Sequence, residues 1–182
     1  GGGTNLTQFT ANTDTINLAA NADIDTSATD GTITFHVDGQ VLGGTNTINA
    51  GAGTFKIYPL TSTFSIELAP TDSALGTNVF YDSDWTDVTA DSFIVGDATH
   101  TGTIHMGSDS GITAGYHLDV INGGIGDIIV RNDYDSSVFG GDLTINSGSG
   151  EITVGVGSAV DIALGTGIFT ASDPVTLNNN CT

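Results

Sequence analysis

The sequence has almost no positive charge. Its 182 residues include 21 aspartates and glutamates but only two basic residues, Lys56 and Arg131, so the formal net charge is -19. Proteins that bind nucleic acid neutralise the phosphate backbone with lysine and arginine, and docking on anionic lipid needs the same residues. The composition therefore argues strongly against a nucleic-acid partner. We expect instead an acidic surface whose self-repulsion is relieved by cations.

Cysteine, proline and long apolar runs are also scarce. The one cysteine, Cys181, has no partner for an intramolecular disulfide, and a lone thiol in a secreted protein is a candidate for a contact between copies. No run of 18 apolar residues occurs, so no membrane insertion is predicted. The three prolines, and 26 glycines without a Gly-X-Y period, exclude collagen.

The ends of the sequence carry few features. The chain opens GGGTNLT, without an initiator methionine or the basic and apolar segments of a signal peptide. We therefore expect a processed product or a segment of a longer chain. Asn5 begins an Asn-Leu-Thr sequon and is a candidate glycosylation site. With 38% hydrophobic residues, residues 1–182 are expected to form a single domain with its own core.

Apolar residues alternate with polar ones almost everywhere, which is typical of half-buried β-strands. In GTITFHVDG, for example, Ile33, Phe35 and Val37 alternate with threonine, histidine and aspartate. No segment predicts a convincing helix. Similar runs rich in threonine and β-branched residues predict strands at 54–58, 64–68, 78–82, 92–96, 103–107, 116–122, 127–133, 142–146, 152–156 and 160–164.

Turn signals such as Asp-Gly and Gly-Gly separate these strands at intervals of roughly 10 residues. The turns are short, and no long crossover segment of the kind that a Greek key needs is present. The outward positions are mostly Thr, Ser, Asp and Asn, which stack in ladders. These features favour an all-β fold, a β-solenoid of short Thr- and Gly-rich strands, with coils of one to two dozen residues and on the order of eight coils. A β-sandwich is the alternative.

Residues 45–107 resemble the β-helical repeats of filamentous-haemagglutinin-like secreted exoproteins. The resemblance implies a right-handed parallel β-solenoid that is secreted to the surface of a prokaryotic cell and serves adhesion or matrix structure. The family's helical stretch is replaced here by residues 81–85, YDSDW. The matching motifs are Ile48-Asn49-Ala50-Gly51, Gly53-Thr54-Phe55, Ile66-Glu67-Leu68, Val88-Thr89-Ala90, Phe93-Ile94-Val95-Gly96-Asp97 and Gly102-Thr103-Ile104.

No catalytic motif is recognisable in the sequence. A GxSxG elbow is missing. Cleavage of acidic glycans needs carboxylates beside a basic group, but Lys56 and Arg131 lie far apart in the sequence, and neither belongs to a repeated acid-rich strand pair. We therefore expect no enzymatic activity. His105 and His117 are expected at outward strand positions, and HExxH or HxH spacing is absent among His36, His100, His105 and His117.

Two acidic turns are candidate Ca²⁺ sites, because closely spaced carboxylates offer the hard oxygen ligands that this ion prefers. The first is the DxDxxD cluster of Asp82, Asp84 and Asp87, and the second is Asp133 with Asp135. Neither follows the EF-hand pattern. Acidic turns are also common as plain solvated loops, so both interpretations stay open.

The ends of the chain are strand-like, uncharged and rich in Thr and Asn, and they lack the polar helix or charged strand that caps natural solenoids. The sequence therefore favours an extracellular structural protein, an adhesin segment or filament subunit at the cell surface. Its expected partners are copies of itself, joined end to end near Cys181 into an open filament, and surface glycans.

The alternative function is a carbohydrate- or ice-binding module. Residues 80, 81 and 85 form the only aromatic cluster with the potential to stack on a sugar ring, although burial of these rings is also expected. Ice binding needs one TxT motif in every coil. The motifs in this chain are irregularly spaced, since they begin at Thr13, Thr32, Thr45, Thr61 and Thr101.

Overall fold

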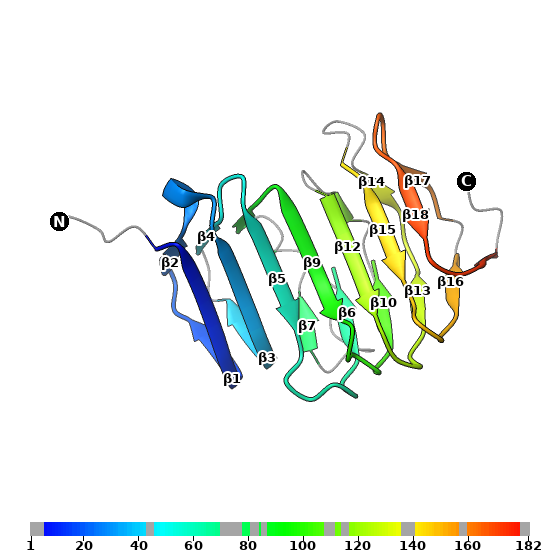
Figure 1. Cartoon of the computed structure of the whole chain (residues 1–182), viewed down its shortest axis with the longest axis horizontal. Coiled ribbons are helices and arrows are strands. Elements are labelled where there is room, and N and C mark those ends of the chain that lie inside the picture. Colours follow the sequence, from blue (N-terminus) through cyan, green and yellow to red (C-terminus); the bar gives the residue numbers. More distant parts are fainter. Residues whose placement is uncertain are drawn as a thin grey trace.

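The chain folds as a parallel β-solenoid of about six turns with essentially no helix. Figure 1 shows the coils stacked side by side along the long axis, with the N-terminal coil at one end and the C-terminal coil at the other. A single turn of 3₁₀ helix, η1 (Ser27–Thr29), follows β2. The computed structural model describes residues 6–42, 46–69, 78–80, 84, 87–107, 112–113, 117–135, 141–156 and 160–178.

The strands form three sides of the coil. In spatial order the front sheet contains β1 (Gln8–Leu18), β3 (Thr32–Leu42), β5 (Thr54–Tyr58), β9 (Ser92–Asp97), β12 (His117–Asn122), β15 (Leu143–Asn146) and β18 (Phe169–Ala171). The back sheet contains β7 (Asn78–Phe80), β6 (Ile66–Leu68), β10 (Ile104–Met106), β13 (Ile128–Val130), β16 (Ile152–Val154) and β19 (Val175–Leu177). Two short side sheets complete the coil. The first contains β2 (Asp23–Asp25), β4 (Thr47–Asn49) and β8 (Val88–Thr89). The second contains β11 (Ile112–Thr113), β14 (Tyr134–Asp135) and β17 (Ile162–Ala163).

Strand register gives the length of each coil, because paired residues occupy the same position in successive coils. Thr54 of β5 pairs with Ser92 of β9, and Ser92 pairs with His117 of β12, so the coil that begins at β5 is much longer than the next one. This long coil contributes two strands to the back sheet, β6 and then β7, which pair in parallel with each other. The coils therefore lie at or beyond the upper end of the expected length, and the stack has about six turns rather than eight.

Every described strand pairing is parallel, which rules out the β-sandwich for the described residues because that fold is built from antiparallel sheets. In Figure 1 the front strands point downward while the coils advance from left to right, so the coil is right-handed. This is the normal hand for crossovers between parallel strands.

Inward side chains stack in ladders along the front sheet. Burying one such side chain contributes about 1.5–3 kcal/mol, and the rings of Phe55 and Phe93 lie with their centroids 4.8 Å apart. The middle members of one seven-residue ladder, from Ile33 to Leu143, are 0% exposed. We call this ladder the phenylalanine ladder; it consists of Phe9, Ile33, Phe55, Phe93, Leu118, Leu143 and Phe169.

Glycines form a column at the corner between the front and back sheets. A Cβ on Gly126 would lie 2.3 Å from the carbonyl oxygen of Gly102, and a Cβ on Gly150 would lie 2.0 Å from that of Gly126. Only glycine allows successive coils to approach this closely. The same corner is held by the buried Asn122, whose Nδ2 donates to the Gly102 carbonyl at 2.6 Å.

Candidate functional site

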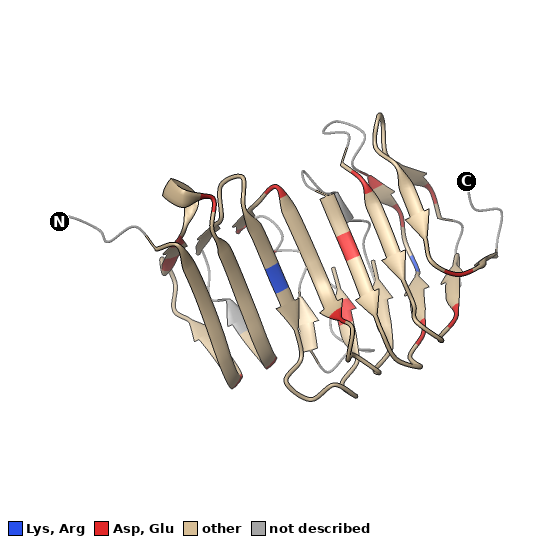
Figure 2. Cartoon of the chain, in the orientation of Figure 1, with Lys and Arg blue, Asp and Glu red and all other residues tan. Residues whose placement is uncertain are grey.

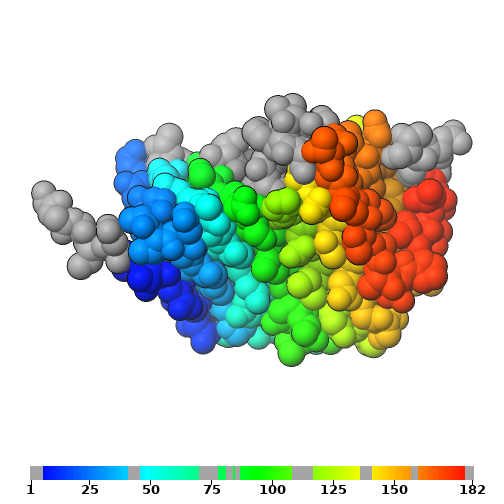
Figure 3. All heavy atoms as spheres, turned by 45° about the horizontal axis from the view of Figure 1, so that its top comes forward, coloured from blue at the N-terminus to red at the C-terminus, as the bar shows by residue number. Residues whose placement is uncertain are grey.

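The two ends of the front sheet are open in the part of the chain that the structure describes. β1 is the first strand of the sheet and β18 is the last, and no described strand pairs with the outer edge of either. Figure 3 shows the described coils in continuous contact from the N-terminal to the C-terminal end. Open edges of this kind are the places where a sheet recruits further strands.

The last coil also exposes apolar side chains. Ile168 is 65% exposed, Phe169 is 37% exposed and Leu177 is 63% exposed. At the opposite end, Phe9 is only half-buried. Phe9 and Phe169 are the two end members of the phenylalanine ladder, so the buried core of the solenoid reaches both ends with one face of its last side chain uncovered by described residues.

An ionisable cluster lies on the outer face of the back sheet. Glu67 of β6 pairs in register with His105 of β10, and the Nε of Arg131, just after β13, donates to the Nδ1 of His105 at 3.4 Å. Glu67 is 1% exposed and His105 is 8% exposed. Its neighbours in β10, Ile104 and Met106, belong to the core, so His105 alternates outward as predicted, but it is buried.

The electrostatics of this cluster follow from its burial. Burial lowers the pKa of His105, the nearby Arg131 guanidinium lowers it further, and the Glu67 carboxylate partly offsets both effects. Arg131 also donates its backbone N–H to the carbonyl of Met106 at 2.9 Å, and Asn132 Nδ2 donates to that of Gly107 at 2.7 Å. The hydrogen bonds of Arg131 and Asn132 thus join the coils of β13 and β10, and Glu67 of the preceding coil contributes its charge.

The outer face of the front sheet carries a second cluster, His36 of β3 with Lys56 and Tyr58 of β5. The rings of His36 and Tyr58 are stacked, with centroids 4.4 Å apart and an interplanar angle of 27°. Lys56 Nζ lies 4.9 Å from the Tyr58 ring centroid, in a cation–π contact. Burial and the Asp97 carboxylate raise the pKa of Tyr58. A half-buried aromatic pair with a cation beside it is able to stack on a sugar ring.

The row of outward side chains through Lys56 is not a continuous threonine ladder. Threonines occupy both of its ends, but a lysine, an isoleucine and an aspartate occupy its middle. In strand order the row is Thr10, Thr34, Lys56, Ile94, Asp119, Thr144 and Thr170.

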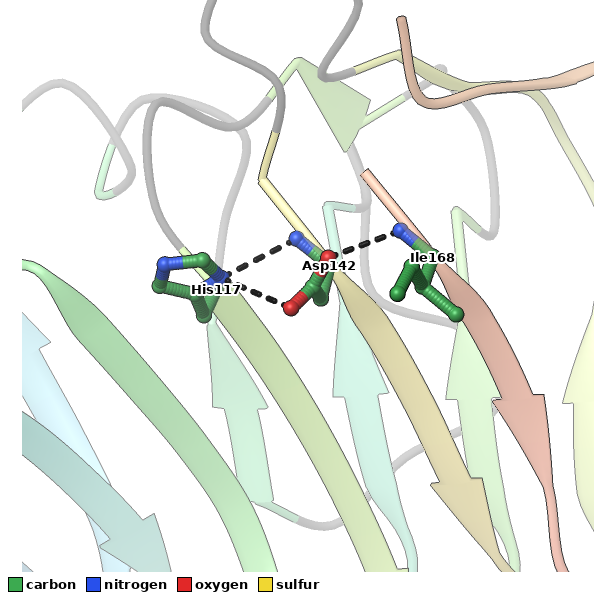
Figure 4. Close-up of polar contacts among 3 residues, drawn as sticks. All are labelled: His117, Asp142 and Ile168. Carbon is green, nitrogen blue, oxygen red and sulfur yellow. Dashed lines mark hydrogen bonds and ion pairs between the residues drawn. The ribbon is translucent and has the colours of Figure 1, made fainter. Parts of the chain in front are cut away.

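A third polar group joins the starts of β12, β15 and β18 (Figure 4). Asp142 donates its backbone N–H to His117 Nδ1 at 3.1 Å, and its Oδ1 accepts the backbone N–H of Ile168 at 2.7 Å. The same Nδ1 lies 3.5 Å from Asp142 Oδ2. Because Nδ1 already accepts the backbone N–H, a neutral His117 cannot also donate a proton from that nitrogen to the carboxylate. The contact is an ion pair only in the protonated state.

The two acidic turns predicted to bind Ca²⁺ make different contacts. Asp84 is 5% exposed; its backbone carbonyl accepts the N–H of Asp87 at 3.1 Å, and burial raises the pKa of Asp87. Asp133 Oδ1 instead accepts the backbone N–H of Asp161 at 2.7 Å, and Asp135 follows shortly after Asp133 in the chain. Asp82 lies outside the described residues.

Among the residues that the structure describes, no three His, Cys, Asp or Glu side chains gather into a metal-binding group. Figure 2 shows the described acidic residues distributed along the whole stack, mostly where strands begin or end. A Ca²⁺ site at Asp82, Asp84 and Asp87 or at Asp133 and Asp135 therefore stays a prediction.

The remaining residues singled out in the sequence are either outside the described part of the chain or buried in the core. Asn5 and Cys181, and the aromatic residues Tyr81 and Trp85, lie outside the described residues. Phe80 belongs to the core, where it is 0% exposed, and its ring centroid lies 5.4 Å from that of Phe93. It is therefore not available to a sugar. None of the described helical segments has the length and apolarity to cross a membrane.

Sequence reasoning did not identify the clusters on the outer faces. His36 and Tyr58 share a register position in neighbouring coils, so knowledge of the local coil length would have placed them together. Glu67 and His105 also pair in register, but the unusually long third coil separates them in the sequence. No regular period predicts that pair.

No protein-family model, no curated protein and no solved structure matches the chain. The parallel β-solenoid implied by the resemblance of residues 45–107 is confirmed by the fold itself. A relation to the filamentous-haemagglutinin-like exoproteins stays a prediction from the quoted motifs.

Proposed function

We propose that the chain is an extracellular structural protein, an adhesin segment or filament subunit, whose copies associate end to end. The observation that carries the proposal is the front sheet, a single in-register stack whose first and last strands, β1 and β18, both have an open edge among the described residues. One copy can therefore continue the sheet of the next. A head-to-tail contact that does not close into a ring gives an open filament.

The remaining features are consistent with an architectural role. The buried cluster of Glu67, His105 and Arg131 spans successive coils, and the Nε of Arg131 is directed at His105; we assign it to holding coils in register and propose no catalytic step for it. The location at a cell surface follows from the resemblance of residues 45–107 to secreted adhesins. The charge of -19 favours solubility where cations are abundant.

Electron microscopy of the purified chain tests this proposal. We expect negatively stained filaments one solenoid wide at high protein concentration in the presence of Ca²⁺, and a sedimentation coefficient that rises with concentration. A monodisperse monomer at every concentration, with and without Ca²⁺, would contradict end-to-end association.

Surface glycans are a second proposed partner, and the stacked rings of His36 and Tyr58 beside Lys56 favour them. The Tyr58→Ala variant should lose binding on a glycan array, because the sugar loses its stacking surface. Thr144→Ala, on the same outer face of the front sheet, should bind as the unmodified chain does. Absence of binding by the unmodified chain, or equal binding by both variants, would exclude this site.

A further inference from the structure

We propose that the junction between copies is a parallel pairing of β18 of one copy with β1 of the next, in the register that sets Phe169 against Phe9. This inference rests on the proposed end-to-end association and specifies its contact. It follows from three observations: the residues on the two end strands, the direction of their free backbone groups, and the distribution of charge.

The two end strands carry the same tripeptide. β1 contains Phe9-Thr10-Ala11, and β18 is Phe169-Thr170-Ala171. The strand register places Phe9 and Phe169 at the two ends of the phenylalanine ladder. If the ladder continues across the junction, phenylalanine lies on phenylalanine inside the solenoid, and the outward threonines and inward alanines also meet their equivalents. The exposed ring of Phe169 is then covered.

At alternate residues the backbone of β18 presents groups that no described strand pairs with. In a parallel ladder the N–H and C=O of one residue point to the same neighbouring strand, and those of the next residue point to the opposite side. Leu143 donates its N–H to the carbonyl of Ile168 at 3.0 Å, and Ser172 donates to Ile145 at 2.9 Å. The backbone N–H and C=O groups of residues 168, 170 and 172 therefore point to β15. Those of Phe169 and Ala171 point to the open edge.

The backbone of β1 presents the complementary groups. Thr54 donates its N–H to the carbonyl of Gly31 at 3.3 Å, so the backbone groups of residues 31 and 33 point to β5. Those of Thr32, and of every second residue after it, point to β1. Given the pairing of Gln8 with Thr32, the residues of β1 that face the open edge are Gln8, Thr10 and Asn12.

These free groups match in the proposed register. A residue in a parallel ladder bonds to the residues on either side of its partner. Phe169 opposite Phe9 therefore donates its N–H to the Gln8 carbonyl and accepts the N–H of Thr10. Ala171 makes the same pair of bonds with Thr10 and Asn12. A shift of one residue would set Phe169 and Ala171 against groups that already bond to β3.

Charge also favours this contact. The segments 8–12, QFTAN, and 168–172, IFTAS, contain no charged residue in a chain whose net charge is -19. Most contacts between two copies of such a chain bring carboxylates together and cost free energy. The β18–β1 contact brings no carboxylates together within the paired residues.

Two proline variants test the junction. Proline removes an N–H and is tolerated on an edge strand where that N–H faces outward. Ala171→Pro blocks the C-terminal edge and Thr10→Pro blocks the N-terminal edge. Each variant alone should remain monomeric, and an equimolar mixture should form dimers but nothing larger, because each variant keeps one intact end. Thr170→Ala, which keeps the backbone groups, should form filaments like the unmodified chain.

Cysteine cross-linking provides a second measurement that does not depend on how well the proline variants fold. Neighbouring parallel strands lie about 4.8 Å apart, within the Cα separation of about 4.4–6.8 Å that a disulfide spans. With Cys181 changed to serine, a chain carrying both Thr10→Cys and Thr170→Cys should give a ladder of disulfide-linked oligomers. Each single cysteine variant should give no ladder beyond a dimer.

The outcomes separate the junction from the proposed function. Filaments that persist in the folded proline variants, or filaments without the cysteine cross-link, would overturn the β18–β1 pairing and leave end-to-end association through another contact. Failure of the unmodified chain to assemble would overturn both.

Discussion

The Oδ1 of Asp142 accepts the backbone N–H of Ile168 at 2.7 Å, so a side chain at the start of β15 holds the first residue of the next coil (Figure 4). Asp142 also donates its own N–H to His117 in the preceding coil. One residue thus fixes three neighbouring strands at the same corner.

Replacing Asp142 with alanine should loosen the last coil. A hydrogen bond to a charged group contributes about 1.5–3 kcal/mol, but the Asp142 side chain is 45% exposed, so we expect a loss of about 1 kcal/mol in the free energy of unfolding. Faster amide hydrogen exchange in β18 should accompany the loss. Asp119→Ala, on the outer face of β12, is the control and should change exchange in β18 little.

The glycine column should not tolerate a methyl group. Gly126→Ala forces a Cβ to within 2.3 Å of the Gly102 carbonyl oxygen, whereas at Gly39 the nearest atom to an added Cβ is Thr15 Oγ1 at 3.8 Å. We expect Gly126→Ala to lower the free energy of unfolding by about 2 kcal/mol or more, through displacement of the corner backbone, and Gly39→Ala to change it little. Denaturant unfolding of both variants measures the difference. Equal losses would show that the coils can separate at this corner.

Stability should fall as the pH drops below the ordinary histidine pKa. His100 is 1% exposed and His105 is 8% exposed, so water hardly reaches either ring. Burial lowers the pKa values of His100 and His105 below 6.5. Between the folded and unfolded pKa values the unfolded chain binds more protons, so the free energy of unfolding decreases as the pH falls below 6.5.

The His100→Leu variant isolates the contribution of this buried ring. Its Tm should decline less than that of the unmodified chain between pH 7 and pH 5, and His105→Leu gives the corresponding measurement for the other histidine. Parallel Tm profiles for the unmodified chain and both variants would assign the acid sensitivity to carboxylates instead.

Divalent cations should stabilise the chain beyond simple screening. Because 21 carboxylates oppose two basic side chains, Ca²⁺ should raise the Tm more than NaCl of matched ionic strength does. Asp87→Asn should reduce this excess if the acidic turn binds the ion, and Asp23→Asn, at the exposed first residue of β2, is the matched control. Identical effects of the two salts would leave screening alone as the explanation.

Most strands of the front and back sheets could be predicted because each carries at least two apolar residues in an alternating segment, whereas β1, β18 and β19 were not among the predicted segments. Ile33, Phe35 and Val37 are all 0% exposed, as their spacing in the sequence predicts. Of the side-sheet strands, only β17 falls within a segment predicted as a strand, 160–164. β2 and β8 contain one apolar residue each, too few to establish a period of two, and they depend on pairing with neighbouring coils for their conformation.

The positions of the polar clusters were beyond the sequence because they depend on coil length. His105 was correctly expected to face outward, but its alternation with apolar neighbours gives no information on what covers the outer face. Arg131 reaches His105 from the next coil, and that contact requires the register of β10 with β13. The Phe-Thr-Ala repeat at positions 9 and 169 was visible in the sequence, and only the register showed that both copies occupy the same ladder.

The seven-strand front sheet gives a filament of this protein a characteristic X-ray fibre pattern. With neighbouring strands about 4.8 Å apart and the junction at the same spacing, each copy advances the fibre by seven spacings, about 34 Å. A meridional reflection near 4.8 Å is then accompanied by a layer line at about 34 Å. An amyloid fibre of identical stacked segments repeats at every strand and has the first spacing without the second.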